Sequence, residues 1–324
     1  MQIFHSIEEI PADFGPSVVT IGNFDGVHLG HQAVIADVIE RARALHVRSV
    51  AVTFDPHPIR IVRPQIPLRL ITQLDQKLSL LAQTGIDAVL ILPFTHTLSR
   101  LTARQFARTV LCDALNAVEV HEGENFRFGA DAGADVHELS SLGKEFGFTV
   151  HVHSATKRRG TIVSSSIVRA AITAGNMRAA RQLLGRPFEI FSTPASGRGY
   201  GSRYTVPTIN LAPYKELLPA NGVYITCLEL HGEQFESVTN VGNRPTFKEE
   251  SFAVETHILN FHPITLDEST QLRLGFLDRI RPEIEWPSPQ TLKEQIGRDV
   301  ARARHYFGLC HALSGGSSDS SKAR

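Results

Sequence analysis

Residues 17–46 read SVVTIGNFDGVHLGHQAVIADVIERARALH, and this stretch decides the fold of the N-terminal half. SVVTIG is an apolar strand candidate, and the residues from 31 onward have helical periodicity. The loop between them is rich in glycine, which lets the backbone turn tightly and approach a ligand. The start of the helix offers unpaired N–H groups to an anion. The stretch therefore predicts a strand–loop–helix unit whose loop handles phosphate.

The alternation of short apolar runs with helical patterns continues to about residue 186. Further strand candidates are RSVAVTF (48–54), DAVLIL (87–92), AVEVHE (117–122) and FTVHVH (148–153). Between two of them, Thr102 and Gln105 form the capping box of a helix start. Repeated βα units predict a doubly wound parallel sheet, with the ligand crevice at the carboxyl ends of its strands. Two short helices ending at Gly175 and Gly185 close this half, and we place the domain boundary after residue 186, before Pro187.

Beyond Pro187 the apolar pattern changes to a period of two, which is typical of strands. The runs are GVYITCLEL (222–230), ESVTNVG (236–242), FAVETHILNF (252–261) and LRLGFLDRI (272–280). A helix follows, with Ser288 as its cap and Gly308 as its stop. We therefore expect residues 187–312 to form a small antiparallel β-barrel with a terminal helix, and residues 313–324 a disordered tail.

The composition excludes several classes of protein. Lys and Arg total 33 and Asp and Glu total 33, so no net field attracts nucleic acid or an anionic membrane. The three cysteines form no CxxC pair, which argues against a disulfide framework or a zinc site and suits a reducing cytoplasm. Neither a signal peptide nor a membrane span is recognisable. We expect a cytoplasmic protein with no nucleic-acid or membrane partner.

The loop GNFDGVHLGH (22–31) is the first candidate site. Gly22, Gly26 and Gly30 allow close approach to a ligand, and His28 and His31 are spaced so that both imidazoles converge on one oxyanion. The chain has no Walker motif GxxxxGK[ST], and the loop is no GxGxxG fingerprint. The alternative, a glycine-rich turn with two surface histidines, is disfavoured by the full string directly after a strand.

This loop resembles that of the HxGH nucleotidyltransferase superfamily. Three further segments narrow the resemblance to the bifunctional riboflavin kinase/FMN adenylyltransferase family: FDPHP (54–58), NFRFG (125–129) and SSSIVR (164–169). Each segment also has a physical interpretation. The aromatics of NFRFG suit stacking on a flat ring, and its arginine suits a phosphate. The serines, which by themselves more often form a plain helix cap, offer hydroxyls and N–H groups to an anion.

The resemblance implies roles for residues of this half. His28 and His31 would stabilise the transferring adenylyl group, with Asn23 and the glycines positioning it. Phosphates would be bound by Ser164, Ser165 and Arg169, and the flavin by Asn125, Phe126, Arg127 and Phe128. The family often has Asp where this chain has Asn125, so we give Asn125 no acid–base role.

The second candidate site lies in the C-terminal half. Gly197 and Gly199 can wrap phosphates with backbone N–H groups. Thr208 and Asn210 are two residues apart on an extended segment, so they face the same side and suit a shared Mg²⁺. Glu255 points away from the apolar face of its strand and suits the acceptance of a proton from an attacking alcohol. Singly, each of these features is more often a plain structural one.

Together these features resemble the riboflavin kinase module. There PTxN binds metal and nucleotide, and the glutamate activates the ribityl 5′-hydroxyl. The family usually reads LGFPTAN where residues 204–210 are YTVPTIN, so Thr205-Val206 replaces a Gly-Phe pair. Because the metal and base positions remain, we predict an active kinase.

The predicted enzyme converts riboflavin and ATP to FMN and ADP at the C-terminal site. It then converts FMN and ATP to FAD and pyrophosphate at the N-terminal site, with Mg²⁺ at both. Two alternatives remain open. A cytidylyltransferase for a phosphorylated alcohol shares the HxGH loop but leaves residues 187–307 unexplained. A flavin-binding sensor with a decayed kinase site would bind riboflavin or FMN without forming ADP.

Overall fold

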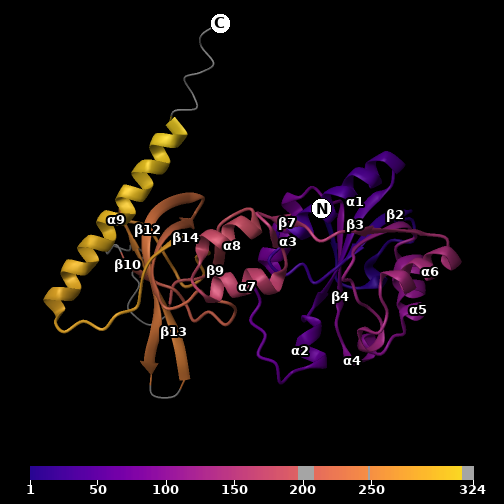
Figure 1. Ribbon diagram of the computed structural model, residues 1–324, viewed down its shortest axis with the longest axis horizontal. Coiled ribbons are helices and arrows are strands. Elements are labelled where there is room, and N and C mark those ends of the chain that lie inside the picture. The colour runs from indigo at the N-terminus through magenta and orange to yellow at the C-terminus, as the bar shows by residue number, and fades with distance from the viewer. Residues whose placement is uncertain (196–207, 247–248, 316–324) are drawn as a thin grey trace, which may run out of the picture. The chain divides into compact units, whose positions relative to one another are not determined.

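The computed structural model describes residues 1–195, 208–246 and 249–315 (Figure 1). The chain divides into two compact units, Met1–Val168 and Arg169–Arg324. Among the described residues, no helix is long and apolar enough to span a membrane. Each unit is built on its own sheet.

The first unit contains a six-stranded sheet in which every neighbouring pair of strands is parallel. Its strands are β1 Gln2–Phe4, β2 Ser17–Ile21, β3 Arg48–Asp55, β4 Ala88–Pro93, β5 Ala117–Gly123 and β6 Thr149–His153. Their order in the sheet is β1-β4-β3-β2-β5-β6. The chain thus moves outward from β2 through β3 and β4, and then returns to the other side of β2 at β5. Ligands in such sheets bind at the carboxyl ends of the strands where the order reverses, which here is between β2 and β5.

Helices cover both faces of this sheet, which confirms the predicted doubly wound α/β class. The longer ones are α1 Leu29–Leu45, α3 Leu74–Gln83, α5 Ala103–Phe106 continued by η2 Ala107–Ala114, and α6 Val136–Phe146. The short ones are η1 Ile7–Glu9, α2 Pro58–Val62, α4 His96–Ser99 and η3 Ala130–Ala132. Ile35 of α1 and Leu81 of α3 pack with Ala51 on one face, whereas Leu111 of η2 packs in the cluster with Val50 on the other. The predicted capping box of Thr102 with Gln105 is present at the start of α5.

Two small strands and two short helices follow the parallel sheet in the chain. They are β7 Lys157–Arg158, β8 Thr161–Ile162, α7 Ser165–Thr173 and α8 Met177–Leu184. Helix α8 ends at Gly185, whose φ of 77° is left-handed, as the sequence predicts. In the second unit, α8 packs against strands β9 Phe188–Ser192 and β14 Leu272–Pro282. Arg178 of α8 forms a 2.5 Å ion pair with Asp278 of β14.

The second unit contains a six-stranded antiparallel sheet in the order β10-β13-β12-β11-β14-β9. Its remaining strands are β10 Thr208–Asn210, β11 Gly222–Leu230, β12 Glu233–Thr246 and β13 Glu249–Ile258. The residues that follow the two edge strands are joined as well. Ala195 N–H donates to the Asn210 carbonyl oxygen at 2.8 Å, and Ala212 N–H donates to that of Thr193 at 2.8 Å. These bonds curl the sheet onto itself, as the expected barrel requires.

Helix α9, Pro289–Gly315, packs its apolar stripe on the second sheet. Ala303 and Phe307 are buried against it, whereas Leu292 and Ile296 at the beginning of the stripe are exposed. The predicted stop at Gly308 is wrong, because the helix continues to Gly315. A glycine inside a helix costs only about 1 kcal/mol relative to alanine, which the favourable residues after it can offset.

Candidate active sites

The loop between β2 and α1 has a strained backbone. Phe24 and Val27 have φ of 47° and 38°, in the left-handed region that non-glycine residues rarely adopt. Gly26, with φ of 83°, lies between them, and a Cβ there would meet Cγ2 of Ile71 at 3.0 Å. Strained backbone of this kind persists only where the surrounding structure holds it, and it clusters at functional sites.

A second loop holds this one in place. Oδ1 of Asp25 accepts hydrogen bonds from the N–H groups of Ile71 at 2.9 Å and Thr72 at 3.2 Å. The Gly26 N–H donates to Oγ1 of Thr72 at 3.0 Å. The carboxylate of Asp25 is buried, so these contacts fix the loop from inside. They explain why the strained backbone of residues 24–27 is maintained.

His28 and His31 form a stacked pair at the start of α1. Their ring centroids are 3.6 Å apart, and their planes differ by 15°. His28 is the N-cap of the helix, and its Nδ1 accepts a hydrogen bond from the His31 N–H at 3.3 Å. This bond requires an unprotonated Nδ1, so the proton of a neutral His28 ring lies on Nε2. Burial and the neighbouring His28 and Lys77 hold the pKa of His31 well below 6.5, so His31 is neutral near pH 7.

The close packing at Gly30 explains why this position has no side chain. A Cβ at Gly30 would lie 3.2 Å from Cε1 and Nδ1 of His28 and 3.4 Å from the Val163 carbonyl oxygen. The position of a side chain at Gly30 is therefore occupied by the His28 ring and by the segment that precedes α7. That Gly22, Gly26 and Gly30 let a ligand approach the backbone stays a prediction.

The serine segment reaches the same loop. Ser165 Oγ donates a hydrogen bond of 3.0 Å to the carbonyl oxygen of Asp25. Ser164 caps α7, since its Oγ accepts from the Ile167 N–H at 3.4 Å. Arg169 follows Ser165 by four residues on α7 and so lies on the same face of that helix. The plain-cap interpretation thus describes Ser164, while Ser165 joins the start of α7 to the glycine-rich loop.

A cavity of about 860 Å³ opens beside Gly22 and Asn23. Its lining includes the predicted flavin segment, residues 125–128. Phe126 and Phe128 stack on each other at 5.4 Å, and Phe128 is buried. Arg127 forms an ion pair with Asp135 at 3.2 Å. The cavity thus brings the flavin candidates and the beginning of the HxGH loop together at one edge of the sheet.

The predicted kinase residues lie together on β10 and β13. Thr208 is paired with His257, and Asn210 with Glu255. Directly opposed residues of antiparallel strands share one face, so all four side chains lie on the same side of the sheet. Thr208 Oγ1 and His257 Nδ1 are in hydrogen-bond contact at 3.2 Å. The other two predicted residues, Gly197 and Gly199, lie outside the described residues, as do Thr205 and Val206.

Comparisons with known proteins match both halves of the chain. A family model described as FAD synthetase matches residues 10–167, and one described as riboflavin kinase matches residues 184–307. A bifunctional riboflavin kinase/FMN adenylyltransferase of Pseudomonas fluorescens is 35% identical over 306 residues, which are 94% of this chain and 97% of the relative. The chain belongs to the bifunctional riboflavin kinase/FMN adenylyltransferase family.

A second curated relative agrees with this membership, and a solved structure has a similar fold. The protein of the same name from Escherichia coli (strain K12) is 33% identical over 308 residues, covering 94% of this chain and 96% of its own length. A solved structure described as a macrolide-efflux protein from Streptococcus pneumoniae superposes with a TM-score of 0.82 at 27% identity. The superposition covers 93% of this chain and 98% of the solved chain. The name macrolide-efflux protein belongs to the solved protein.

Three residues near the two sites of this family member were not predicted. Lys77 is buried on α3, and its Nζ donates to the Asn23 carbonyl oxygen and to Thr53 Oγ1, both at 3.2 Å. Burial lowers the pKa of Lys77. Glu122 is buried at the end of β5 and is discussed with the predictions below, and His257 contacts Thr208 as described. The available signal was a charged residue within an apolar pattern, in LDQKL for Lys77 and AVEVHE for Glu122.

Proposed function

We propose that the site at the carboxyl edge of the first sheet transfers an adenylyl group from ATP to FMN. We also propose that the half-buried face of β10 and β13 that carries Thr208 and Glu255 is the site of riboflavin phosphorylation. As a member of its family, the chain is a bifunctional enzyme of flavin cofactor synthesis, a riboflavin kinase and an FAD synthetase. We assign the adenylyl transfer to residues 1–186 and the kinase to residues 187–312, with residues 313–324 as a tail.

The stacked pair of His28 and His31 carries the adenylyl-transfer proposal. In this step a phosphate oxygen of FMN bonds to the α-phosphorus of ATP, and the bond from that phosphorus to the bridging oxygen of pyrophosphate breaks. Such a transfer needs positioning and charge stabilisation and no covalent intermediate. His28 presents Nε2–H, and the first turn of α1 presents N–H groups that lack partners within the helix. These donors face the charge that grows on the transferring phosphoryl oxygens.

The remaining N-terminal residues bind and orient the substrates in this proposal. Cavities of about 300–1,000 Å³ are usual for ligands of this size, and the 860 Å³ space beside Asn23 falls in that range. We place the flavin ring there, against residues 125–128. The nucleotide phosphates lie at Gly22, Gly26 and Gly30 and along the start of α7. The residues that hold them there are Ser164, which caps α7, and Ser165 and Arg169 on α7.

In the kinase step, the ribityl 5′-hydroxyl attacks the γ-phosphorus of ATP, and ADP leaves. Glu255 is the residue that accepts the hydroxyl proton. Thr208 and Asn210 offer a hydroxyl and an amide oxygen next to that carboxylate, which is a set of hard oxygen donors that fits Mg²⁺. When bound, Mg²⁺ supplies charge neutralisation for the phosphates. Gly197 and Gly199 are proposed to wrap these phosphates with their N–H groups.

We propose the cytoplasm as the compartment in which the protein works. All three cysteines, Cys112, Cys227 and Cys310, are free thiols, and burial raises the pKa of Cys112 and Cys227. Thiols of this kind suit a reducing compartment.

The proposal is tested by incubating the protein with riboflavin, ATP and Mg²⁺ and separating the flavins over time. We expect FMN to form first and FAD to follow. FMN that accumulates without FAD would contradict the transferase assignment. FAD from supplied FMN but no product from riboflavin would contradict the kinase assignment. Replacement of ATP by CTP should abolish both steps, whereas a cytidylyltransferase would require CTP.

A further inference from the structure

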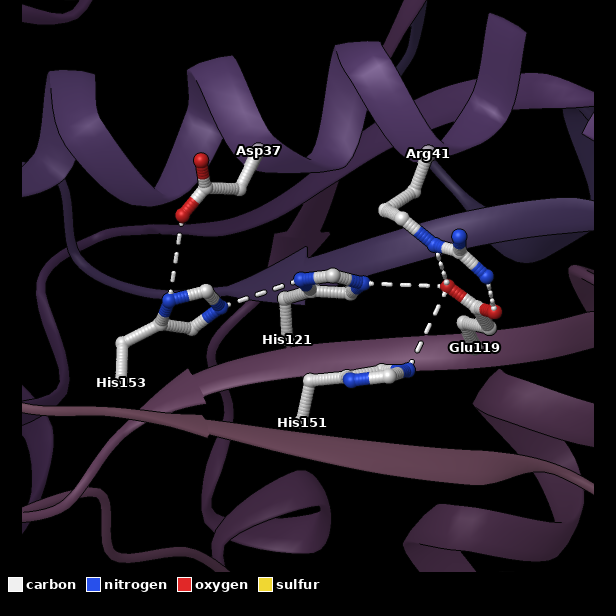
Figure 2. A network of polar contacts seen from close by, with 6 residues as sticks. All are labelled: Asp37, Arg41, Glu119, His121, His151 and His153. Atoms are coloured by element: carbon white, nitrogen blue, oxygen red, sulfur yellow. Dashed lines mark hydrogen bonds and ion pairs between the residues drawn. The ribbon is translucent and has the colours of Figure 1, made fainter. Parts of the chain in front are cut away.

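A cluster of polar residues lies between α1 and the strands β5 and β6, and neither proposed active site uses it (Figure 2). Asp37 and Arg41 come from α1, and Glu119 comes from β5. Three histidines complete the cluster, namely His121 on β5 and His151 and His153 on β6. The pairing of β5 with β6 places His121 directly opposite His151.

The spacing of three of these side chains matches a tetrahedral metal site. Oε2 of Glu119 lies 3.3 Å from Nε2 of His121 and 3.4 Å from Nε2 of His151. The three atoms all lie within 4.8 Å of one another. An ion with bonds of about 2.0–2.1 Å in tetrahedral geometry separates its ligand atoms by about 3.3–3.4 Å. Two of the three separations therefore already have the value that a bound ion requires.

One of the three ligand atoms has no hydrogen-bond partner in the part of the chain that the structure describes. Nε2 of His151 is buried and makes no hydrogen bond with these residues, although it lies 3.4 Å from Oε2 of Glu119. Two hydrogen bonds link the other groups, His121 Nε2 with Glu119 Oε2 at 3.3 Å and His121 Nδ1 with His153 Nε2 at 3.0 Å. His153 Nδ1 also lies 3.2 Å from Asp37 Oδ2. A metal ion between the three ligand atoms would supply the partner that His151 Nε2 lacks.

A metal ion bound to the three ligand atoms also sets the tautomers of the rings behind them. With a metal ion at the three ligand atoms, His121 Nδ1–H donates to His153, and His153 Nδ1–H donates to Asp37. The ligating His121 is then supported by His153, and His153 by the Asp37 carboxylate, and such support behind a ligating histidine is usual in metal sites.

We propose that Glu119, His121 and His151 bind Zn²⁺, with water as the fourth ligand. His153, Asp37 and Arg41 hold the ligands in position; Arg41 does so through hydrogen bonds of 2.9 Å and 2.5 Å to Glu119. Two imidazoles and one carboxylate favour Zn²⁺ over Mg²⁺, which prefers oxygen ligands. From the sequence a zinc site is not expected, because the cysteines form no CxxC pair, whereas the ligands proposed here are a carboxylate and two imidazoles from the strand segments AVEVHE and FTVHVH.

A bound Zn²⁺ would link β5 to β6 directly, and it would stabilise their contacts with α1 through Asp37 and Arg41. Helix α1 begins next to His28, and β5 ends next to residues 125–128, so both segments carry parts of the proposed transferase site. An ion that binds the folded chain but not the unfolded chain raises the melting temperature by mass action. Zn²⁺ should therefore stabilise the protein independently of any effect on activity.

The test uses the full chain, freed of metal by a chelator and then titrated with Zn²⁺ at pH 7.5 in the presence of millimolar Mg²⁺. His151→Ala removes one ligand from the edge strand, where the side chain is 39% exposed and its loss is tolerable. His137→Ala is the matched control, since His137 is an exposed histidine on α6. We expect the wild type and His137→Ala to bind one more Zn²⁺ than His151→Ala does. Asp37→Asn should weaken this site by about 10- to 100-fold.

The test compares the Zn²⁺ stoichiometry of two variants because His28 and His31 form a second pair of imidazoles. Any Zn²⁺ bound at that pair is the same in both variants and cancels in the comparison. Co²⁺ gives an independent signal, since we expect intense visible bands of a tetrahedral site in the wild type and their loss in His151→Ala. Equal Zn²⁺ stoichiometry in the wild type and His151→Ala would overturn the proposal. So would imidazole ¹⁵N resonances of the wild type that show a doubly protonated ring in this cluster and no response to Zn²⁺.

Discussion

The imidazole of His28 caps the helix that carries His31, and the two rings stack with centroids 3.6 Å apart. One side chain thus ends the strained loop of residues 24–27, begins α1 and forms half of the proposed catalytic pair. The helix start and the catalytic geometry are therefore determined by the same hydrogen bond, from the His31 N–H to Nδ1 of His28.

His28→Asn separates these two roles, because Asn is among the best helix caps but lacks the imidazole. We expect the melting temperature to stay near that of the wild type and the kcat of FAD formation to fall by about 10²- to 10³-fold. His28→Ala should lose the same activity and in addition about 1 kcal/mol of stability. Melting curves and FAD formation from supplied FMN measure both effects. Full activity in His28→Asn would mean that His28 acts only as a cap.

Gly30→Ala adds a methyl group against the His28 ring at 3.2 Å and the Val163 carbonyl oxygen at 3.4 Å. Because contacts of 3.2–3.4 Å are tighter than ordinary van der Waals contact, we expect the His28 ring to be displaced by a few tenths of an ångström. A displacement of about 1 Å costs on the order of 10²-fold in rate, so we expect FAD formation to slow by up to about 10-fold. FMN formation from riboflavin should be unchanged.

Gly297→Ala is the matched control for Gly30→Ala, because Gly297 also lies in a helix and an added Cβ there meets no atom within 4 Å. It should keep both activities and gain up to about 1 kcal/mol of stability. Equal rates of FAD formation in the two variants would contradict the packing argument for Gly30.

The buried carboxyl of Glu122 should make the free energy of unfolding of the protein depend on pH. This carboxyl accepts a hydrogen bond from the Ile21 N–H at 2.5 Å, and burial raises its pKa well above 4.5. In the unfolded chain Glu122 ionises near pH 4.5, whereas in the folded chain it stays protonated to higher pH. Its contribution to stability is thus complete below pH 4.5 and is lost as the pH rises.

Glu122→Gln keeps an acceptor for the Ile21 N–H and removes the titration. The free energy of unfolding of the variant, relative to the wild type, should therefore increase from pH 4.5 to pH 8. Urea unfolding followed by circular dichroism at several pH values measures this difference. A difference that stays constant or decreases over this range would show that Glu122 is ionised in the folded protein.

The parallel sheet could be predicted from the sequence because its strands are short apolar runs separated by well-capped helices. The second sheet could be predicted from its two-residue period, which agrees with the burial of the alternate residues Val254, Thr256 and Ile258 on β13. The prediction of helix α9 was correct at the start of the helix but wrong at its end. Gly308 alone does not determine whether the following residues remain helical. The sequence of α8 likewise does not predict which sheet the helix packs against. An amphipathic helix has a recognisable apolar face, but its sequence does not identify the element that covers this face.

The motifs identified residues that the fold then brings together, such as Ser165 with Asp25 and Thr208 with Glu255 on one face. Lys77, Glu122 and the cluster around Glu119 could not be predicted in this way. They depend on contacts between residues 24 to 101 positions apart, which only the strand order of the sheet determines. A buried charge within an apolar run is visible in the sequence, but its partner is not.

The most direct test of the account is a comparison of His31→Ala with Glu255→Ala in both reactions. His31 lies at the start of α1 in the first unit, and Glu255 lies on β13 in the second. The account predicts that His31→Ala forms FMN from riboflavin at the wild-type rate but forms no FAD. It predicts that Glu255→Ala forms FAD from supplied FMN but no FMN from riboflavin. Loss of both activities in either folded variant would contradict the assignment of two separate sites.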